Sequence, residues 1–347
     1  MVRMDRLWTG CKPLSMVLAL GCSLACSSEK VARKGAMKPI LDPEAVGGHL
    51  SKYSEAARRR LESVLFNEHF DGVIESEIVQ DVIRLQGGAP TFEEFMVDML
   101  PIARLYSVPA TSGFRVGAVC DGASGKIYFG ANLELPRAPL GFTIHAEQSA
   151  IANALAHGEK AVLRLAVTAA PCGHCRQFLN ELTTASRFQV IIAGQPPTTL
   201  KSLLPNSFGP ADLGVEGGLM GQMETPLVSL SGASSPVAEA ALRAASRSYS
   251  PYTLSYSGLA FRLEDGTITA GSYVESAAYN PSLPPVIAAI DRLRFSGREY
   301  ADISEAVLVE SEGAKISQEG STRLVLHLIA PGTELRVLRA RIAKALR

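Results

Sequence analysis

Hydrophobic positions follow a helical period near the start of the chain and a strand period further on. Apolar residues recur at helical spacing from Gly48 to Phe70 and again from Thr91 to Tyr106. Thr91 can cap the second helix, because Glu94 lies three residues further on and can reach back to the cap. The pattern predicts a small helical region over residues 37–106.

Beyond residue 106, short apolar stretches with strand character alternate with helical segments. We predict strands at 115–120, 126–131, 162–169 and 188–193, and helices at 146–157 and 173–184. Strands that alternate with helices are typical of an α/β fold in which helices cover one sheet. We therefore expect a three-layer α/β/α sandwich over residues 107–215. A Pro- and Gly-rich connection at 195–230 follows, and we place the linker at 216–233.

The same order of elements returns after the linker. We predict a helix at 234–247, strands at 258–263 and 267–274, a helix at 285–294 and a strand at 305–310. Gly130-Ala-Asn-Leu-Glu134 is echoed by Gly271-Ser-Tyr-Val-Glu275, and Tyr106-Ser107 by Tyr249-Ser250. We infer a tandem duplication with the second copy at 234–347. A chance resemblance between two hairpins is the alternative.

Composition limits the possible functions. The 347 residues are 47% hydrophobic, enough for two or three domains with sizeable cores. The 34 Lys and Arg residues balance the 34 Asp and Glu residues. A protein that binds the phosphates of long nucleic acids needs an excess of positive charge. The net charge of zero therefore favours small ligands and protein partners over nucleic acid.

The first 36 residues differ from the rest of the chain. Arg3 and Arg6 precede an apolar run over 14–25, which is the pattern of a signal peptide and too short to span a membrane. Cys22 faintly resembles a lipoprotein cleavage site, which would attach the chain to a membrane. The alternative is a non-native extension from an upstream start codon, because Met37 opens a more ordinary sequence.

Two short motifs at predicted helix starts carry candidate chemistry. His145-Ala-Glu147 precedes Pro171-Cys-Gly-His-Cys175, and zinc takes imidazole nitrogen and thiolate sulfur as ligands. His145, Cys172 and Cys175 supply three ligands, which leaves one position for water, as in catalytic zinc sites. Glu147 lies near the metal and can move a proton. The motifs predict one catalytic Zn²⁺ per chain.

Other interpretations of these residues are a purely structural zinc site and a thioredoxin-like dithiol, although the dithiol leaves His145 and Glu147 without a role. His174, between the two cysteines, is expected behind the metal ligands or at the surface. Cys120 falls in a predicted strand and is expected in the core. The remaining cysteines, Cys11, Cys22 and Cys26, belong to the N-terminal segment, and six cysteines so irregularly placed do not indicate a disulfide scaffold.

At the two motifs the sequence resembles the zinc nucleobase deaminases, whose signature is H-x-E followed by P-C-x-x-C. From about Tyr53 to the C-terminus it is similar to the two-domain, homodimeric cytidine deaminases of some bacteria and plants. The matching segments are His145-Ala-Glu-Gln-Ser-Ala-Ile151, Pro171-Cys-Gly-His-Cys-Arg-Gln-Phe178, Leu204-Pro-Asn-Ser-Phe-Gly-Pro-Ala-Asp-Leu213 and Tyr279-Asn-Pro-Ser-Leu-Pro-Pro285.

The resemblance implies a duplicated cytidine deaminase-like sandwich and a hydrolase. Cytidine and 2′-deoxycytidine would be deaminated to uridine and 2′-deoxyuridine plus ammonia, in pyrimidine salvage. Zinc-bound hydroxide would attack C4, and Glu147 would shuttle the proton. Two other functions stay open, a zinc deaminase for a modified base or nucleic acid and a non-catalytic zinc-binding module. The cytosolic substrate and the two reduced thiolates favour a cytoplasmic enzyme.

The resemblance also implies residues that bind the substrate. Phe114 would stack on the pyrimidine, while Asn132 and Glu134 would hydrogen-bond the ribose 3′-hydroxyl. Ala146 would contact the substrate as well. Phe208 would reach the site of a neighbouring subunit, so the expected partner is a second copy of the chain.

Three features depart from the family pattern. Gly113 stands where the family commonly has Asn, and Ala170 stands where relatives often have Thr, so we expect altered affinity rather than lost activity. In the second copy, Ser282-Leu-Pro-Pro-Val286 takes the place of the His145 region and no C-x-x-C follows. We therefore expect a degenerate copy that serves packing and helps to shape the active site.

Overall fold

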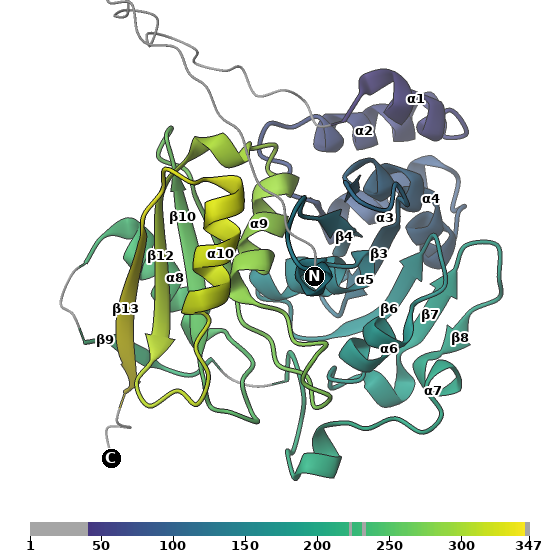
Figure 1. Ribbon diagram of the computed structural model, residues 1–347. Helices are drawn as coiled ribbons and strands as arrows, with labels where there is room; N and C mark the ends of the chain where they lie inside the picture. Colours follow the sequence, from purple (N-terminus) through teal and green to yellow (C-terminus); the bar gives the residue numbers. More distant parts are fainter. Residues whose placement is uncertain (1–40, 222–223, 231–233, 344–347) are drawn as a thin grey trace, which may run out of the picture. The chain divides into compact units, whose positions relative to one another are not determined.

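The computed structural model describes residues 41–221, 224–230 and 234–343 (Figure 1). Three expectations concern residues 1–37, which lie outside these ranges: a signal-like segment, its three cysteines and a start at Met37. The described residues belong to one compact unit. Among them, no helix is both long enough and apolar enough to cross a membrane.

Four helices form the N-terminal region. They are α1 (Pro43–Leu50), α2 (Glu55–Leu65), α3 (Ser76–Leu85) and α4 (Phe92–Leu105). The single amphipathic segment predicted from Gly48 to Phe70 is wrong, because Ser54 lies outside the helices and its hydroxyl caps α2 by accepting a hydrogen bond from the Ala57 N–H. The cap predicted at Thr91 is confirmed, since its N–H donates to the Glu94 carboxylate at 2.7 Å and its hydroxyl accepts from the Glu94 N–H.

The first sheet has the strand order β1-β4-β3-β6-β7-β8, and only β6 and β7 run parallel. Its strands are β1 (Val73–Ile74), β3 (Gly117–Gly122), β4 (Ile127–Ala131), β6 (Val162–Val167), β7 (Gln189–Ile192) and β8 (Thr198–Thr199). Successive residues of β3 face opposite cores: Val119 lies with α4, and Cys120 lies with α5 (Ala146–Ala156). The expected three-layer α/β/α sandwich is therefore present.

The second sheet repeats this arrangement with the order β11-β10-β12-β13-β9. Its strands are β9 (Leu227–Ser229), β10 (Ser257–Leu263), β11 (Ile268–Ser272), β12 (Ile303–Ser311) and β13 (Leu335–Ile342). Helix α8 (Pro236–Ser246) covers one face, and α9 (Pro285–Phe295) and α10 (Glu319–Ile329) cover the other. The stretch 195–230 is more than a connection, because it also contributes β8, α7 (Leu200–Leu203) and β9.

Matching strand pairings relate the first repeat (residues 92–192) to the second repeat (residues 236–342). The pairing of Val108 with Leu133, between β2 (Val108–Pro109) and β5 (Leu133–Glu134), recurs as the bridge of Tyr249 with Val274. The duplication is therefore confirmed. The echo of Tyr106-Ser107 in Tyr249-Ser250 is wrong by two residues, since Tyr249 corresponds to Val108. Two identical residues in a row do not determine how the two repeats align. The pairing between strands determines it.

Close contacts between strand and helix also recur at equivalent positions. A Cβ atom on Gly130 of β4 would lie 2.2 Å from the carbonyl oxygen of Ala146 in α5. A Cβ atom on Gly271 of β11 would lie 2.2 Å from the backbone nitrogen of Ala289 in α9. Both repeats therefore need glycine so that the helix can approach the strand.

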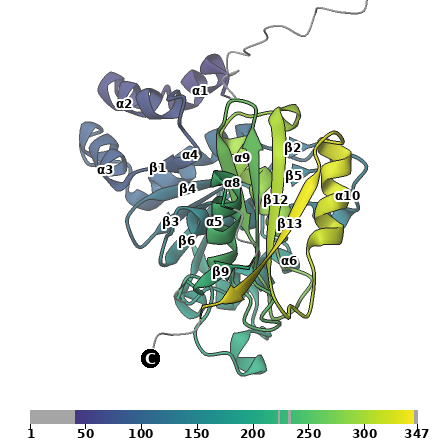
Figure 2. The same cartoon turned by 90° about the vertical axis from the view of Figure 1, so that its left-hand side faces the viewer.

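The inner helices of the two repeats share one hydrophobic core. Ile151 of α5 and Ile290 of α9 are both fully or almost fully buried and belong to the same cluster, together with residues of both sheets. Helices α5 and α9 pack against each other, as Figures 1 and 2 show. The catalytic motifs predicted on α5 therefore lie on the side of the first repeat that faces the second.

Candidate active site

The predicted metal ligands come together where two helices begin. His145 is the residue before α5, and Cys172 is the residue before α6 (Gly173–Leu179). The Nδ1 atom of His145 lies 3.4 Å from the Cys172 sulfur and 3.3 Å from the Cys175 sulfur, and the two sulfurs are 3.7 Å apart. Across residues 41–221, 224–230 and 234–343, this is the only cluster of three or more potential His, Cys, Asp or Glu ligands.

These distances fit a tetrahedral zinc ion. Zinc–sulfur bonds of about 2.3 Å and zinc–nitrogen bonds of about 2.0 Å at tetrahedral angles place the two sulfurs about 3.8 Å apart and each sulfur about 3.5 Å from the nitrogen. The observed separations agree with these values to about 0.2 Å. One corner of the tetrahedron has no protein ligand within this cluster, as in catalytic zinc sites.

The charges of the cluster favour a cation. Hydrogen bonds from the Cys175 thiol and from His145 lower the pKa of the Cys172 thiol to about 3. The bond with Cys172, together with burial, raises the pKa of Cys175, so the two thiols share one negative charge. A divalent cation stabilises both thiolates. The positive end of α6 adds to this stabilisation, since Cys172 stands at the N-cap position of that helix.

Glu147 lies in the first turn of α5 and is only 4% exposed. Burial raises the pKa of its carboxyl group above the ordinary value of 4.5, and the nearby His145 opposes this rise only in part. A carboxyl group with a raised pKa can accept and release a proton closer to neutral pH. Glu147 therefore has the position and the environment of a general acid and base next to the cluster.

Asn132 follows β4 and has most of its hydrogen-bonding capacity already in use. Its Oδ1 accepts from the Ser107 hydroxyl at 2.5 Å and from the Val116 N–H at 2.9 Å. Its Nδ2 donates to the Phe114 carbonyl at 2.9 Å. An amide nitrogen has two N–H donors, so one remains for a ligand.

Glu134 of β5 holds the same segment of chain in place. Its Oε2 accepts from the N–H groups of Thr111 and Ser112 at 2.7 and 2.8 Å, and its Oε1 accepts from the Ser112 hydroxyl at 2.5 Å. Partial burial raises the pKa of this carboxyl group, but the bonds from Ser112 and Thr111 prevail and lower it. Glu134 is therefore an ionised acceptor with a free lone pair on Oε1.

The equivalent carboxylate in the second repeat makes the same bonds. Glu275 accepts from the N–H groups of Tyr252 and Thr253 at 2.9 and 3.2 Å. The bridge between Leu133 and Ile144 recurs as the bridge between Val274 and Leu283, which aligns the two repeats. In this alignment, Pro284 and Val286 of the second repeat stand at the positions of His145 and Glu147. Holding the loop is thus a structural task of this carboxylate in both repeats, and it does not exclude a ligand contact in the first.

The other predicted contacts differ in their exposure. Phe114 is 61% exposed, which leaves its ring free to stack on a planar ligand. The side chain of Ala146 is fully buried, so only its backbone can meet a ligand. Its N–H belongs to the first turn of α5, where helices have unpaired donors.

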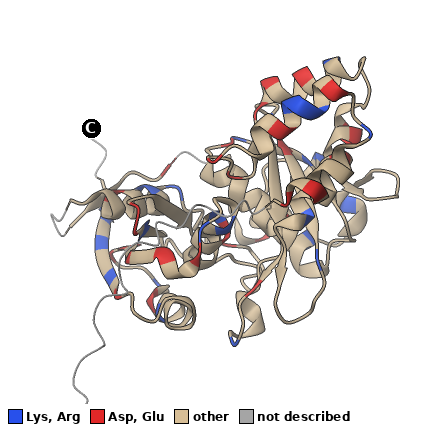
Figure 3. Ribbon diagram, turned by 90° about the horizontal axis from the view of Figure 1, so that it is seen from above, with Lys and Arg blue, Asp and Glu red and all other residues tan. Residues whose placement is uncertain are grey.

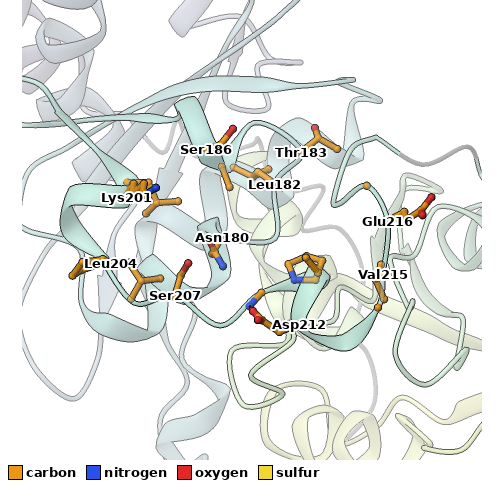
Figure 4. A pocket seen from close by; sticks show the side chains of 18 residues that line it. Asn180, Leu182, Thr183, Ser186, Lys201, Leu204, Ser207, Asp212, Val215 and Glu216 are labelled. Carbon is orange, nitrogen blue, oxygen red and sulfur yellow. The ribbon is translucent and has the colours of Figure 1, made fainter.

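Phe208 lies on a separate segment, after α7. Its carbonyl accepts from the Asn180 side chain at 3.2 Å, while its own ring is 46% exposed. Asn180 and this segment border a cavity of about 740 Å³ (Figure 4). The side chains that Figure 4 labels around it include Lys201, Ser207 and Asp212.

Three residues on or just beyond α5 and α6 contact the second repeat, and the sequence alone did not indicate these contacts. His174, expected behind the ligands or at the surface, is half-buried, and its Nε2 donates to the Asn280 carbonyl at 3.1 Å. Gln148 donates to the Pro281 carbonyl at 3.0 Å. Glu181, just beyond α6, accepts from the Ala277 N–H at 2.7 Å and the Tyr252 hydroxyl at 2.6 Å.

Two further expectations, one about Cys120 and one about the helix after Cys172, have a clear outcome. Cys120 is fully buried, as expected for a core residue, and its thiol contacts the Ala150 carbonyl at 3.5 Å. The helix predicted over 173–184 is too long, because α6 ends at Leu179. The chain turns there, and this turn brings Glu181 to the second repeat.

Comparison with known proteins gives the family. The family described as "Cytidine and deoxycytidylate deaminase zinc-binding region" matches residues 90–191 and, in a second form, residues 200–323. A cytidine deaminase of Vibrio cholerae serotype O1 is 42% identical over 278 residues, which cover 80% of this chain and 93% of that protein. The chain belongs to the cytidine deaminase family. A cytidine deaminase of Aliivibrio fischeri is 40% identical over 287 residues, 82% of this chain and 95% of that protein.

Membership of the cytidine deaminase family makes zinc the cofactor of this chain, and the geometry of His145, Cys172 and Cys175 fits it. The crystal structure of a cytidine deaminase from Burkholderia pseudomallei is 31% identical and covers 33% of this chain and 98% of its own, with a TM-score of 0.30. The second family match includes most of the repeat that lacks the ligand residues.

Proposed function

We propose that this chain is a cytidine deaminase that hydrolyses cytidine and 2′-deoxycytidine to uridine and 2′-deoxyuridine with release of ammonia. The observation that carries the proposal is the tetrahedral arrangement of His145, Cys172 and Cys175 with the buried carboxyl group of Glu147 beside it. Bound zinc supplies Lewis-acid activation of water. Glu147 takes a proton from the attacking water and gives it to the departing amino group.

The substrate contacts follow from the free hydrogen-bonding groups. Asn132 has one N–H left and Glu134 one lone pair, so a sugar hydroxyl at the 3′ position can accept from the first and donate to the second. A nucleoside without that hydroxyl leaves both groups unpaired, which lowers its transition-state binding. The exposed ring of Phe114 stacks on the pyrimidine, and the backbone of Ala146 contacts the base.

A direct assay tests the reaction. Purified protein is mixed with cytidine, and the absorbance change of uridine formation is followed. Wild type should turn over with about one zinc per chain, whereas Glu147→Ala should keep the zinc and lose turnover by about 10²- to 10⁴-fold. A zinc-loaded wild-type protein without turnover would refute the proposal, and high activity in Glu147→Ala would remove the proton-transfer role of that residue.

We infer a homodimer whose sites each take Phe208 from the other subunit. The exposed ring of Phe208 and the cavity beside its segment support this inference. Inactive Glu147→Ala and Phe208→Ala chains, co-expressed, should regain activity, because one site of the mixed dimer then holds both native residues. Sedimentation should give twice the chain mass. A monomer, or no regain of activity in a proven mixed dimer, would contradict the inference.

The role in pyrimidine salvage and a cytoplasmic location follow from the proposed substrate and the two reduced thiols. A nucleic-acid substrate is the weaker candidate. Acidic and basic residues occur close together in both repeats (Figure 3), in contrast to the basic groove that binds a single strand. Faster turnover of cytosine in single-stranded DNA than of free cytidine would reverse this preference.

A further inference from the structure

We infer that Arg294 of the second repeat positions the sugar-binding segment of the first repeat, a role that rests on the proposed function. Arg294 lies near the end of α9 and is 7% exposed. It does not reach the substrate groups themselves. It acts on the backbone that carries them.

The guanidinium group of Arg294 bonds to three backbone carbonyls of the first repeat. Nη1 donates to Tyr106 at 2.6 Å and to Asn132 at 3.2 Å, and Nη2 donates to Ala131 at 3.1 Å. Tyr106 is the residue after α4, and the loop that carries Phe114 begins there. Ala131 is the last residue of β4, and Asn132 connects it to β5. One side chain therefore joins the two segments that meet at the proposed sugar site.

The partner of Arg294 extends this network to the catalytic helix. Asp291 forms an ion pair with Arg294 and accepts from the Ser149 hydroxyl at 2.7 Å. Ser149 lies on α5, two residues after Glu147, and its hydroxyl oxygen also accepts from the Ala131 N–H at 3.2 Å. All of these groups are buried. The helix with the proton-transfer residue and the strand with the sugar-binding residues are thus held by one ion pair.

The first repeat shows that packing alone does not require these charges. Because Ile144 and Leu283 are equivalent, Asp291 corresponds to Ala152 and Arg294 to Leu155. A buried ion pair is costly to desolvate, and apolar side chains of similar volume are often as stable. The charges occur only on the helix of the degenerate repeat, and the guanidinium donates to carbonyls of the first repeat. This asymmetry indicates a task in the active repeat.

The task concerns the direction of one N–H group. The Asn132 amide is held at Oδ1 by Ser107 and Val116, and its backbone carbonyl is held by Arg294. Without Arg294, three buried carbonyls lose a charged donor, and the turn between β4 and β5 relaxes. The remaining Asn132 N–H then no longer points at a sugar hydroxyl with the precision that catalysis needs.

The test replaces both charges with the side chains of the first repeat, Asp291→Ala together with Arg294→Leu, so that no unpaired charge is buried. Steady-state rates are measured with cytidine and with 3′-deoxycytidine. We expect kcat/KM for cytidine to fall about 10- to 100-fold, and kcat/KM for 3′-deoxycytidine to fall by a clearly smaller factor, because only the loosening of α5 affects the second nucleoside. Zinc should remain at about one per chain.

The control removes a partly buried ion pair of the first repeat, with Asp121→Ala and Arg164→Leu. Asp121 is buried, whereas Arg164 is partly exposed and also pairs with Glu93. Arg164 lies near the start of β6, far along the strand from Thr168 and the metal loop, and its guanidinium bonds to Asp121 at 2.6 Å. This variant also loses an Asp–Arg pair, and neither residue bonds to the sugar segment. We expect this control to change kcat/KM by the same factor for cytidine and for 3′-deoxycytidine.

The outcomes separate this inference from the proposed function. If wild type does not prefer cytidine over 3′-deoxycytidine, the sugar contact of the proposed function fails. If wild type prefers cytidine and the Asp291/Arg294 double variant keeps the full preference, the role of Arg294 is refuted and the proposed function stands. Should the double variant not fold, Arg294→Lys serves instead, since lysine keeps the charge but not the planar fork. Arg294→Lys should lose most of the preference for cytidine over 3′-deoxycytidine. A variant that keeps the full preference would refute the positioning role of Arg294.

Discussion

The contact of Gly130 with α5 allows one prediction to be worked from the structure. In Gly130→Ala, the new methyl carbon would lie 2.2 Å from the Ala146 carbonyl oxygen and 2.3 Å from the Ala150 nitrogen. Ordinary contact begins at 3.4 Å, so helix and strand must separate by about 1.2 Å. The displaced end of α5 carries His145 and Glu147. A displacement of this size in catalytic groups costs about 10²-fold in rate, and the overpacking costs about 1–3 kcal/mol of stability.

Gly271→Ala is the matched control, because its methyl group would meet α9 at the same 2.2 Å in the repeat without the metal ligands. Both variants should lose similar stability in urea unfolding. Only Gly130→Ala should also lower kcat for cytidine by about 10²-fold. If the two variants lower kcat equally, or if Gly130→Ala leaves kcat unchanged despite its loss of stability, the proposed link between this contact and catalysis is wrong.

Three further predictions concern metal, helix cap and pH. Cys175→Ala should lose most of the bound zinc, measured by elemental analysis, because two protein ligands hold the ion less tightly than three; full zinc content would contradict the ligand set. Thr91→Ala should cost about 1 kcal/mol in urea unfolding and leave kcat unchanged, since it removes only the cap of α4. Burial raises the pKa of Asp71, but the hydrogen bond and charge of His157 prevail and lower it below the ordinary 3.8. A carboxyl group with a lowered folded pKa adds stability above its unfolded pKa, and this stability is lost as the pH falls through the folded pKa. Asp71→Asn should therefore be less stable than wild type at pH 6, and the gap should close below pH 3.8 in acid unfolding curves; a gap that stays constant would contradict this.

The helical pattern predicted the bounds of α4, α5 and α9 to within one residue. Thr91 and Glu94 marked the start of α4, and the structure confirms the cap. The helical pattern across Gly48–Phe70 hid a break, because α1 and α2 present apolar residues to the same core with almost the same spacing. Helices α3 and α10 and strand β13 were not predicted. Helix α3 was detectable in the sequence, because Ile78, Val79 and Val82 recur at helical spacing and face one core. Strand β13 becomes defined by the sheet that it joins.

The sequence by itself determined the chemistry of the site. The two sulfurs are three residues apart at one helix start, and His145 and Glu147 flank another, so local geometry alone assembles most of the cluster. Only the tertiary structure decided how that cluster is supported. Arg294 looks in the sequence like a surface charge near the end of an amphipathic helix. It is buried because α9 packs against the first repeat. Hydrophobic periodicity reports only local structure, so it does not predict contacts between residues so far apart in the chain.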